Sequence, residues 1–377
     1  MAVLMWVSHA ERPLKVDELR HALAVEIGSA DLNTDNLPSI GTLLACCQGL
    51  VVVDKEASTI RLIHFTLQEY LRAHPELFGT AHSTIAETCL SYLNLPQIMA
   101  LPAIPFLRLQ DTPFLEYSSL YWGMHAKSDL SNCAKQLVLK LFDDYSNHVS
   151  AKILLKAQKD WYFSGNHSGK PHLFSGLHCA SFLGIDEIAA ELVEVEGCDI
   201  NQIDSVGNTP LLWAALNGHE RVVEVLLGRD DINPNKLDED GLTPLWWAVW
   251  NGHVGVAELL LGRDDVNPYQ QVDGSLTPLV WAIFNGHEGV VKLLLGRGDV
   301  DPDKPDEVGW TPLGLAAWRG NEGVVKILLA RDDVDSDKPD NYGHTPLWWA
   351  TECKHEEVAS MLLRRSDANP AKRRKLG

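Results

Sequence analysis

Apolar and polar positions recur at a fixed period in the C-terminal half of the chain. Each copy begins with a Thr-Pro pair, continues with an apolar run and a polar turn, and ends with a second apolar run rich in leucine. The Thr-Pro pairs lie at residues 209–210, 243–244, 277–278, 311–312 and 345–346. One more step of the same length toward the N-terminus leads to Ser175-Gly176 and a degenerate copy. The pattern therefore predicts six copies of one structural unit.

Each copy predicts two short helices joined by turns. In the third copy, Thr243 can cap a helix whose first position is Pro244, where the missing N–H of proline has no cost. Gly252 suits the end of this helix, and the apolar residues 256–261 predict a second one. Ordering one copy costs on the order of 50 kcal/mol at ~1.5 kcal/mol per residue, so a single copy cannot fold alone. Stacked copies share a continuous core, which predicts a solenoid.

The consensus Thr-Pro-Leu-x-x-Ala, Asn-Gly-His and Val-Val-x-Leu-Leu-Leu resembles the ankyrin pattern. The resemblance implies a mainly α fold and a protein-binding scaffold that holds its partner in a concave groove. The period of 34 is one residue longer than usual, and the histidine that usually follows Thr-Pro-Leu remains only as His178. The predicted repeats cover residues 169–370, at about 169–202, 203–236, 237–270, 271–304, 305–338 and 339–370. The residues that replace the usual histidine are Leu212, Trp246, Val280, Gly314 and Trp348.

Residues 1–80 predict a different, winged-helix-like module. Residues 10–28 have the pattern of an amphipathic helix, residues 38–48 predict a second helix, residues 50–64 predict a β-hairpin, and a further helix begins at residue 65. The phrases His-Ala-Glu-Arg-Pro-Leu and Leu-Ile-His-Phe-Thr-Leu-Gln-Glu-Tyr-Leu resemble the module that follows the NTPase in fungal NACHT–ankyrin proteins of the NOD-like receptor type. No GxxxxGK[ST] phosphate-binding loop occurs in the sequence, so the NTPase activity of those proteins is not carried over.

Residues 81–168 predict a helical connecting region, with a buried helical segment at residues 113–125. The apolar opening of the chain predicts part of a buried helix, because it is too short for a membrane span. The leading hypothesis is a non-enzymatic scaffold or adaptor. A regulatory fragment of a NACHT-type NTPase acting on an intact relative is one alternative. A nuclear regulator of a transcription factor, in the style of the inhibitor-of-κB ankyrin proteins, is another.

Charge and cysteine usage narrow the choice of partner and compartment. The net charge is −19, and residues 166–370 carry all of it because the rest of the chain is balanced. This field disfavours nucleic acid and favours basic protein surfaces. Seven scattered cysteines indicate reduced thiols and a cytoplasmic location. The basic tail at residues 371–377 resembles a nuclear-import signal, carried by Lys372, Arg373, Arg374 and Lys375.

No sequence pattern is specific enough to indicate a catalytic or metal-binding site. We therefore predict no catalytic residue, no cofactor and no metal site. His167, His172, His178 and Cys179 have no standard ligand spacing. The acids at residues 299–303 lack the glycine and glutamate of a calcium loop and recur at residues 333–337, so solvated loop charges are expected. Cys46 and Cys47 are expected in an apolar core, and His64 at the end of the hairpin.

Large apolar residues occupy two registers of the repeat. Trp213, Trp247, Trp281, Leu315 and Trp349 share one, which is expected to be core. A second register, which usually lines the concave face with polar side chains, is apolar here. Its members are Phe182, Leu216, Trp250, Phe284 and Trp318, and the neighbouring turn tips are Asn208, Leu242, Leu276, Trp310 and His344. These side chains either pack on one another or form an exposed stripe that anchors a partner. Acids beside them, such as Glu239, Asp240 and Glu307, favour a partner helix or peptide with apolar anchors and neighbouring Lys or Arg.

Overall fold

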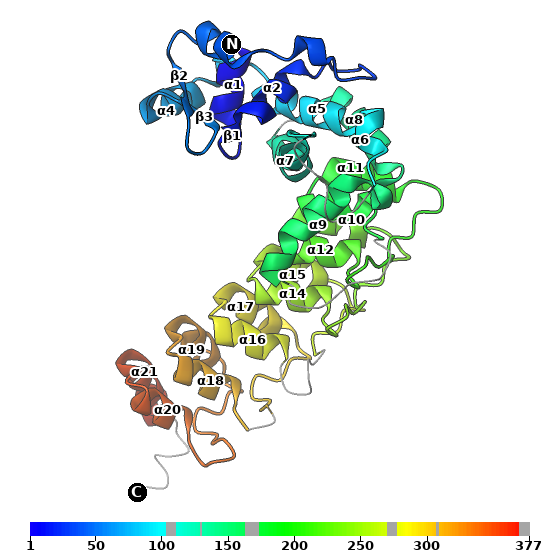
Figure 1. Ribbon diagram of the computed structural model, residues 1–377. Helices are drawn as coiled ribbons and strands as arrows, with labels where there is room; N and C mark the ends of the chain where they lie inside the picture. The colour runs from blue at the N-terminus through cyan, green and yellow to red at the C-terminus, as the bar shows by residue number, and fades with distance from the viewer. Residues whose placement is uncertain (103–110, 129, 163–172, 270–276, 307–308, 369–377) are drawn as a thin grey trace, which may run out of the picture. The chain divides into compact units, whose positions relative to one another are not determined.

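The computed structural model describes residues 1–102, 111–128, 130–162, 173–269, 277–306 and 309–368. The described chain is mainly helical and divides into two compact units (Figure 1). The first unit comprises residues 1–198 and 203–205, and the second comprises residues 199–202 and 206–377. The predicted mainly α architecture is confirmed.

The first unit opens with four α-helices, two short 3-10 helices and a small sheet. The elements are α1 (Ala2–His9), β1 (Leu14–Lys15), α2 (Val16–Ala24), η1 (Thr34–Asn36), α3 (Ile40–Cys46), β2 (Val51–Asp54), β3 (Thr59–Leu62), α4 (Phe65–Ala73) and η2 (Pro75–Leu77). The strands are antiparallel in the order β1-β3-β2, and Val51 pairs with Leu62. The predicted hairpin and the helix that follows it are confirmed. His64 caps α4 by accepting a hydrogen bond at Nδ1 from the N–H of Thr66.

The predicted helix at residues 10–28 is wrong at both ends. Leu14 and Lys15 form a strand, because Leu14 is buried and pairs with Ile60 of the hairpin. The helix α2 begins only at Val16, where Glu18 accepts a hydrogen bond from the N–H of Lys15 at 2.7 Å. Pairing with a strand distant in sequence has overridden the local helical pattern. The prediction for the two cysteines is wrong for one of them, since Cys47 is buried but Cys46 is exposed.

The connecting helices of the first unit are α5 (Ala81–Leu93), α6 (Pro96–Met99), α7 (Leu115–Ser128), α8 (Asn132–Phe142) and α9 (Val149–Tyr162), with η3 (Tyr145–Asn147) before α9. The predicted buried helix at residues 113–125 is confirmed, because Phe114, Tyr117 and Trp122 are fully buried. Trp6 of α1 packs edge-on against Phe114 at 5.6 Å between ring centroids. The apolar opening of the chain is therefore part of a buried helix, as expected.

The repeats form pairs of antiparallel helices. The pair in the first unit is α10 (Gly176–Leu183) and α11 (Asp186–Val193). The second unit contains α12 (Pro210–Leu216), α13 (Glu220–Leu227), α14 (Pro244–Trp250), α15 (Val254–Leu261), α16 (Pro278–Asn285), α17 (Glu288–Gly296), α18 (Pro312–Arg319), α19 (Glu322–Leu329), α20 (Pro346–Glu352) and α21 (Glu356–Ala368). First helices pack on first helices and second helices on second helices, as in a solenoid.

Every first helix in the second unit begins in the same way. The threonine before each proline caps the helix by accepting a hydrogen bond from the N–H three residues later, for example Trp246 to Thr243 at 3.1 Å. In the first pair, Ser175 is the cap and its N–H donates to Nδ1 of His178. The threonine hydroxyl thus caps the helices that lack the usual histidine.

Turns between the helices bring successive repeats together. Gly252 has φ +72°, and a Cβ there would lie 2.7 Å from the ring of His287 in the next repeat. The Nε2–H of His287 in turn donates to the carbonyl of Trp250 at 3.1 Å. His253 and His355 make the equivalent bonds one repeat back, to Leu216 and Trp318. The glycine and the histidine thus connect neighbouring repeats, and in the fifth repeat Asn321 replaces the histidine and donates from Nδ2 to the carbonyl of Ile283.

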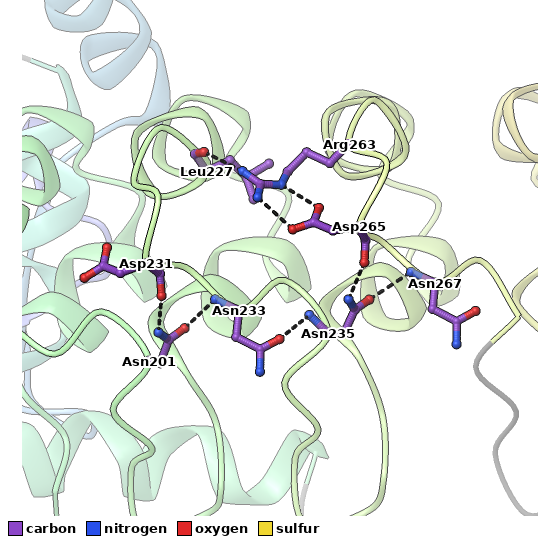
Figure 2. A network of polar contacts seen from close by, with 8 residues as sticks. All are labelled: Asn201, Leu227, Asp231, Asn233, Asn235, Arg263, Asp265 and Asn267. Carbon is purple, nitrogen blue, oxygen red and sulfur yellow. Dashed lines mark hydrogen bonds and ion pairs between the residues drawn. The ribbon is translucent and has the colours of Figure 1, made fainter.

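A second set of polar contacts joins the long loops (Figure 2). Asn201 donates from Nδ2 to the carbonyl of Asp231 and accepts from the N–H of Asn233, both at 2.7 Å. Asn235 repeats this arrangement with Asp265 and Asn267 at 2.6 and 2.9 Å. These side chains satisfy the loop backbone of the following repeat, which fixes the spacing between repeats.

The acids at residues 299–303 take part in this network, so the expectation of solvated loop charges is wrong in part. Asp299 pairs with Arg297 at 3.0 Å, and Asp303 accepts a hydrogen bond from the N–H of Asp335 in the next repeat at 2.7 Å. Burial raises the pKa of Asp303. Among the described residues, the helices are too short or too polar to cross a lipid bilayer.

Candidate binding groove

A cavity of about 460 Å³ opens between the first helices of the last three repeats, α16, α18 and α20. One carboxylate contributes to its wall, and the other residues that line it have apolar or aromatic side chains. The lining residues are Val280, Trp281, Phe284, Asp306, Trp310, Leu315, Trp318 and Trp349. Cavities of this size and composition take a bulky apolar group.

Ring contacts extend the cavity into a continuous aromatic cluster. Trp281 lies 5.5 Å from Phe284, which lies 6.3 Å from Trp318. Trp310 contacts Trp318 at 5.3 Å and Trp349 at 4.5 Å between centroids. On the side of the third repeat, Trp250 lies 4.3 Å from Trp281 and Trp246 lies 4.8 Å from Trp250. We call the surface formed by Trp250, Trp281, Phe284, Trp310, Trp318 and Trp349 the aromatic groove.

Tight turns place the outer tryptophan of the groove. Asp306 accepts a hydrogen bond at Oδ1 from the N–H of Trp310 at 2.8 Å, and its own N–H donates to the carbonyl of Trp310 at 3.0 Å. Gly309 has φ +83° between them, a conformation that favours glycine. The turn thus directs one aromatic side chain and one carboxylate to the same cavity.

The equivalent aspartates in neighbouring repeats bind an indole instead. Asp238 accepts from Nε1 of Trp247 at 2.8 Å, and Asp340 accepts from Nε1 of Trp349 at 3.0 Å. Burial raises the pKa of Asp238, and its hydrogen bonds oppose this only in part. Burial by itself would also raise the pKa of Asp340. Its hydrogen bonds, of which the one from the N–H of His344 has the largest effect, outweigh burial, so the pKa of Asp340 is lowered.

The fourth and fifth repeats depart from this pairing, and the cavity lies there. In the fifth repeat the tryptophan is replaced by Leu315, which has no indole N–H to offer Asp306. In the fourth repeat the position of the aspartate holds valine in the sequence. The Nε1 of Trp281 is buried without a hydrogen-bond partner among the described residues.

The residues predicted to form an exposed apolar stripe differ in their exposure to solvent. Trp250 is 37% exposed, and Phe284 and Trp318 are half-buried in the groove. Leu216 is 3% exposed, so its place in a binding stripe is wrong and it belongs to the core. Phe182 is half-buried and lies in the first unit.

The predicted turn tips divide in the same way. Trp310 and His344 are half-buried, and Trp310 lines the cavity. Asn208 and Leu242 are 0% and 6% exposed, which contradicts their prediction as surface contacts. Leu276 and the rim acid Glu307 lie outside the described residues.

The residues of the register that was expected to be core also differ in burial. Trp213 and Trp247 are buried, and Leu315 is buried at the floor of the cavity. Trp281 and Trp349 are half-buried and line the cavity, so their prediction as core residues is wrong. Sequence reasoning missed them because it treated the two registers separately. The signal in the sequence is Leu315, which is smaller than the tryptophan at the same position of the neighbouring repeats.

A cation already lies at the rim of the groove. The guanidinium of Arg319 lies 4.3 Å from the ring centroid of Phe284 and 5.6 Å from that of Trp318. Its Nε also donates to the carbonyl of Phe284 at 3.2 Å. Such contacts indicate that the aromatic faces at this rim attract positive charge.

The fold and the groove define a helical-repeat protein of the kind that typically serves as a non-enzymatic interaction scaffold. A sequence profile described as ankyrin repeats (3 copies) matches residues 177–272 and 279–373. The chain belongs to the ankyrin-repeat family. A second profile, described as the winged helix domain of GPI inositol-deacylase, matches residues 1–81 and concerns that module alone. The predicted winged-helix and ankyrin folds are thus confirmed.

Two solved structures are similar to part of the chain. The ankyrin repeat protein EF0377 is 24% identical over 50% of this chain and 96% of its own, with a TM-score of 0.45. The ankyrin repeat domain of Bcl-3, a member of the IκB family, is 24% identical over 50% of this chain and 85% of its own, with a TM-score of 0.46. A search of curated proteins found no match.

Proposed function

We propose that the chain is a non-enzymatic adaptor that binds another protein in the aromatic groove. The observation that carries this is the cavity of about 460 Å³, lined by four tryptophans and a phenylalanine from three successive repeats. Contiguous aromatic surface of this kind marks partner sites, where tryptophans serve as anchors. The occupant is a bulky apolar side chain of a partner helix or peptide.

The partner carries lysine or arginine beside that anchor. Asp306 supplies a negative charge in the wall of the cavity, and the repeat region as a whole is strongly acidic. Glu239 and Asp240 of the third repeat are exposed and add to the negative charge of the repeats. Charges of this sign accelerate the encounter with a basic partner and weaken it as salt rises.

A displayed library of helical peptides tests both parts of the proposal. The full chain is expected to enrich peptides with one large apolar anchor flanked by Lys or Arg. The double variant Phe284→Ser and Trp318→Ser is expected to lose these peptides by more than tenfold, while Tyr342→Ser, a change at an exposed aromatic that does not line the cavity, keeps them. Equal binding by the folded double variant, shown by circular dichroism, contradicts the groove as the site.

A second candidate role rests on the match to the winged helix at residues 1–81. We propose that the chain acts in trans on an intact NACHT-type NTPase, as the resemblance to fungal NACHT–ankyrin proteins suggests. ATP binding by the complex, but not by this chain alone, would favour this role. ATP binding that is unaffected by addition of the chain argues against this role.

The location of the chain is also a proposal. Reduced cysteines favour the cytoplasm, and the basic residues 372–375 are proposed to allow nuclear import. A fluorescent reporter fused to residues 368–377 is expected to enter the nucleus. A reporter that stays outside the nucleus would show that residues 368–377 do not act as an import signal.

A further inference from the structure

A second cluster of chemically competent side chains lies in the first unit, away from the repeats. Glu11 follows α1, His82 lies in α5 and His125 lies in α7. The carboxylate oxygen and the two imidazole nitrogens all lie within 4.8 Å of one another. Glu11 is exposed, His82 is half-buried and His125 is buried. The cluster is thus a small site with one open side.

The two imidazoles face each other through like atoms. Nδ1 of His82 and Nδ1 of His125 are 2.8 Å apart. Two nitrogen lone pairs at this distance repel unless a proton or a metal ion lies between them. Neutral imidazole nitrogens are metal ligands, so the two facing Nδ1 atoms are placed to bind one ion.

A tyrosine orients the buried histidine. The hydroxyl of Tyr117 lies 3.0 Å from Nε2 of His125 and accepts a hydrogen bond from the N–H of Glu11 at 3.2 Å. When the Nε2–H of His125 donates to this oxygen, Nδ1 carries a lone pair directed at His82. Histidines that bind metals are usually held in this way, by a hydrogen bond at the other ring nitrogen.

We propose that Glu11, His82 and His125 form a binding site for a divalent transition metal of the zinc class, with water in the fourth position. Two imidazole nitrogens and one carboxylate oxygen suit zinc, whereas magnesium and calcium select oxygen ligands. Tetrahedral ligands at ~2.0–2.1 Å lie about 3.3 Å apart, so the rings separate by about half an ångström on binding. The exposed Glu11 side chain closes on the metal.

The consequence of binding is a cross-link between modules. Glu11 belongs to the winged-helix segment, whose match ends at residue 81, and His125 belongs to α7, which begins only at Leu115. A metal held by both stabilises the folded first unit by mass action, because the unfolded chain does not assemble the three ligands. The site is independent of the aromatic groove and of the function proposed for it.

Titration of the full, reduced chain with cobalt tests the ligand set directly. We expect one Co²⁺ per chain, with the visible d–d bands of tetrahedral cobalt and without the intense near-ultraviolet charge transfer that thiolate ligands give. Zinc should displace the cobalt and raise the melting temperature by several degrees. Absence of stoichiometric binding overturns the proposal, and so does a thiolate signature, which would place the metal on cysteines.

Matched variants locate the site. Glu11→Gln removes an exposed carboxylate and His82→Gln a half-buried imidazole, and each is expected to weaken zinc at least tenfold and abolish the thermal shift. Glu69→Gln and His74→Gln change similarly placed residues outside the cluster and should leave both unchanged. Because the Glu11 side chain is exposed, its variant stays folded. Zinc affinity equal to wild type in both Glu11→Gln and His82→Gln overturns the assignment.

Discussion

Single polar side chains hold successive repeats in register. Asn201 and Asn235 each make a pair of hydrogen bonds with the backbone of the next loop, and Asp303 of the fourth repeat accepts one such bond from the fifth. In the third repeat Tyr269 occupies the position, and Lys304 lies over its ring at 5.1 Å. Each of these hydrogen bonds restricts the conformation of one short side chain. In return it pairs backbone N–H or C=O groups that have no partner within their own loop.

Replacing Asn235 by alanine should lower the free energy of unfolding by about 1–2 kcal/mol, since two hydrogen bonds between repeats are lost. The neighbouring Lys236→Ala, which changes an exposed side chain, should stay within about 0.5 kcal/mol of wild type. Urea denaturation followed by circular dichroism measures both. Equal stability of the two variants would show that the hydrogen bonds of Asn235 to the next loop contribute nothing to the free energy of unfolding.

A buried histidine makes the first unit sensitive to acid. Nε2–H of His148 donates to the carbonyl of Leu93 at 3.1 Å, and Nδ1 accepts from the N–H of Ser150. Burial lowers the pKa of His148. Above about pH 6.5 the ring is neutral in both the folded and the unfolded state. Below that pH the unfolded chain binds a proton that the folded chain does not, so stability falls toward the lowered folded pKa.

The free energy of unfolding should therefore decrease below about pH 6.5 by up to about 1.4 kcal/mol per pH unit from this group. His148→Gln keeps a donor for Leu93 but cannot titrate, so its curve should be flatter than that of wild type. Urea midpoints measured between pH 5 and 8 give the comparison. Parallel curves for the two proteins would exclude His148 as a source of acid sensitivity.

At the scale of elements, the repeated Thr-Pro start is the feature that specifies each first helix. The threonine oxygen accepts a backbone N–H, and proline at the next position has none to satisfy. The winged-helix module lacks such a signal before α2, and there a strand forms where the pattern predicted a helix. A strong cap in the local sequence thus sets the first residue of a helix. Where the cap is weak, residues next to the helix can pair with a distant strand instead.

Thr243→Ala should destabilise the protein by about 1 kcal/mol, because the N–H of Trp246 loses its acceptor. Thr243→Ser retains the oxygen and should cost less than half as much. Thermal unfolding of the two variants beside wild type tests the claim. A serine variant as unstable as the alanine variant would indicate that the methyl group, and not the cap, is responsible.

At the scale of the whole molecule, net charge opposes folding. The chain carries −19 at pH 7, and its acids concentrate in the repeats. Pairs such as Arg263 with Asp265, at 2.8 Å, are largely exposed and contribute little. Repulsion between the remaining acids is long-ranged and is screened by salt.

Raising ionic strength from about 0.01 to 0.1 M shortens the screening length from about 30 to 10 Å, and should raise the melting temperature. Calorimetry in sodium chloride and in choline chloride at equal ionic strength separates screening from specific binding of the cation. A melting temperature that falls with both salts would mean that the ion pairs outweigh the repulsion.

The sequence by itself determined the repeats, their helix boundaries and their stacking, because caps, turns and apolar periodicity are local and recur five times. In the winged-helix module, local signals gave the hairpin and the helix after it but missed the strand β1, which forms only by pairing with β3. Only the tertiary structure decided which aromatic residues are accessible. Trp250 and Leu216 share a register, yet one is exposed and the other buried, since burial depends on the side chains of neighbouring repeats. The groove exists where Leu315 replaces a tryptophan, and the cluster of Glu11, His82 and His125 exists because helices distant in sequence pack together.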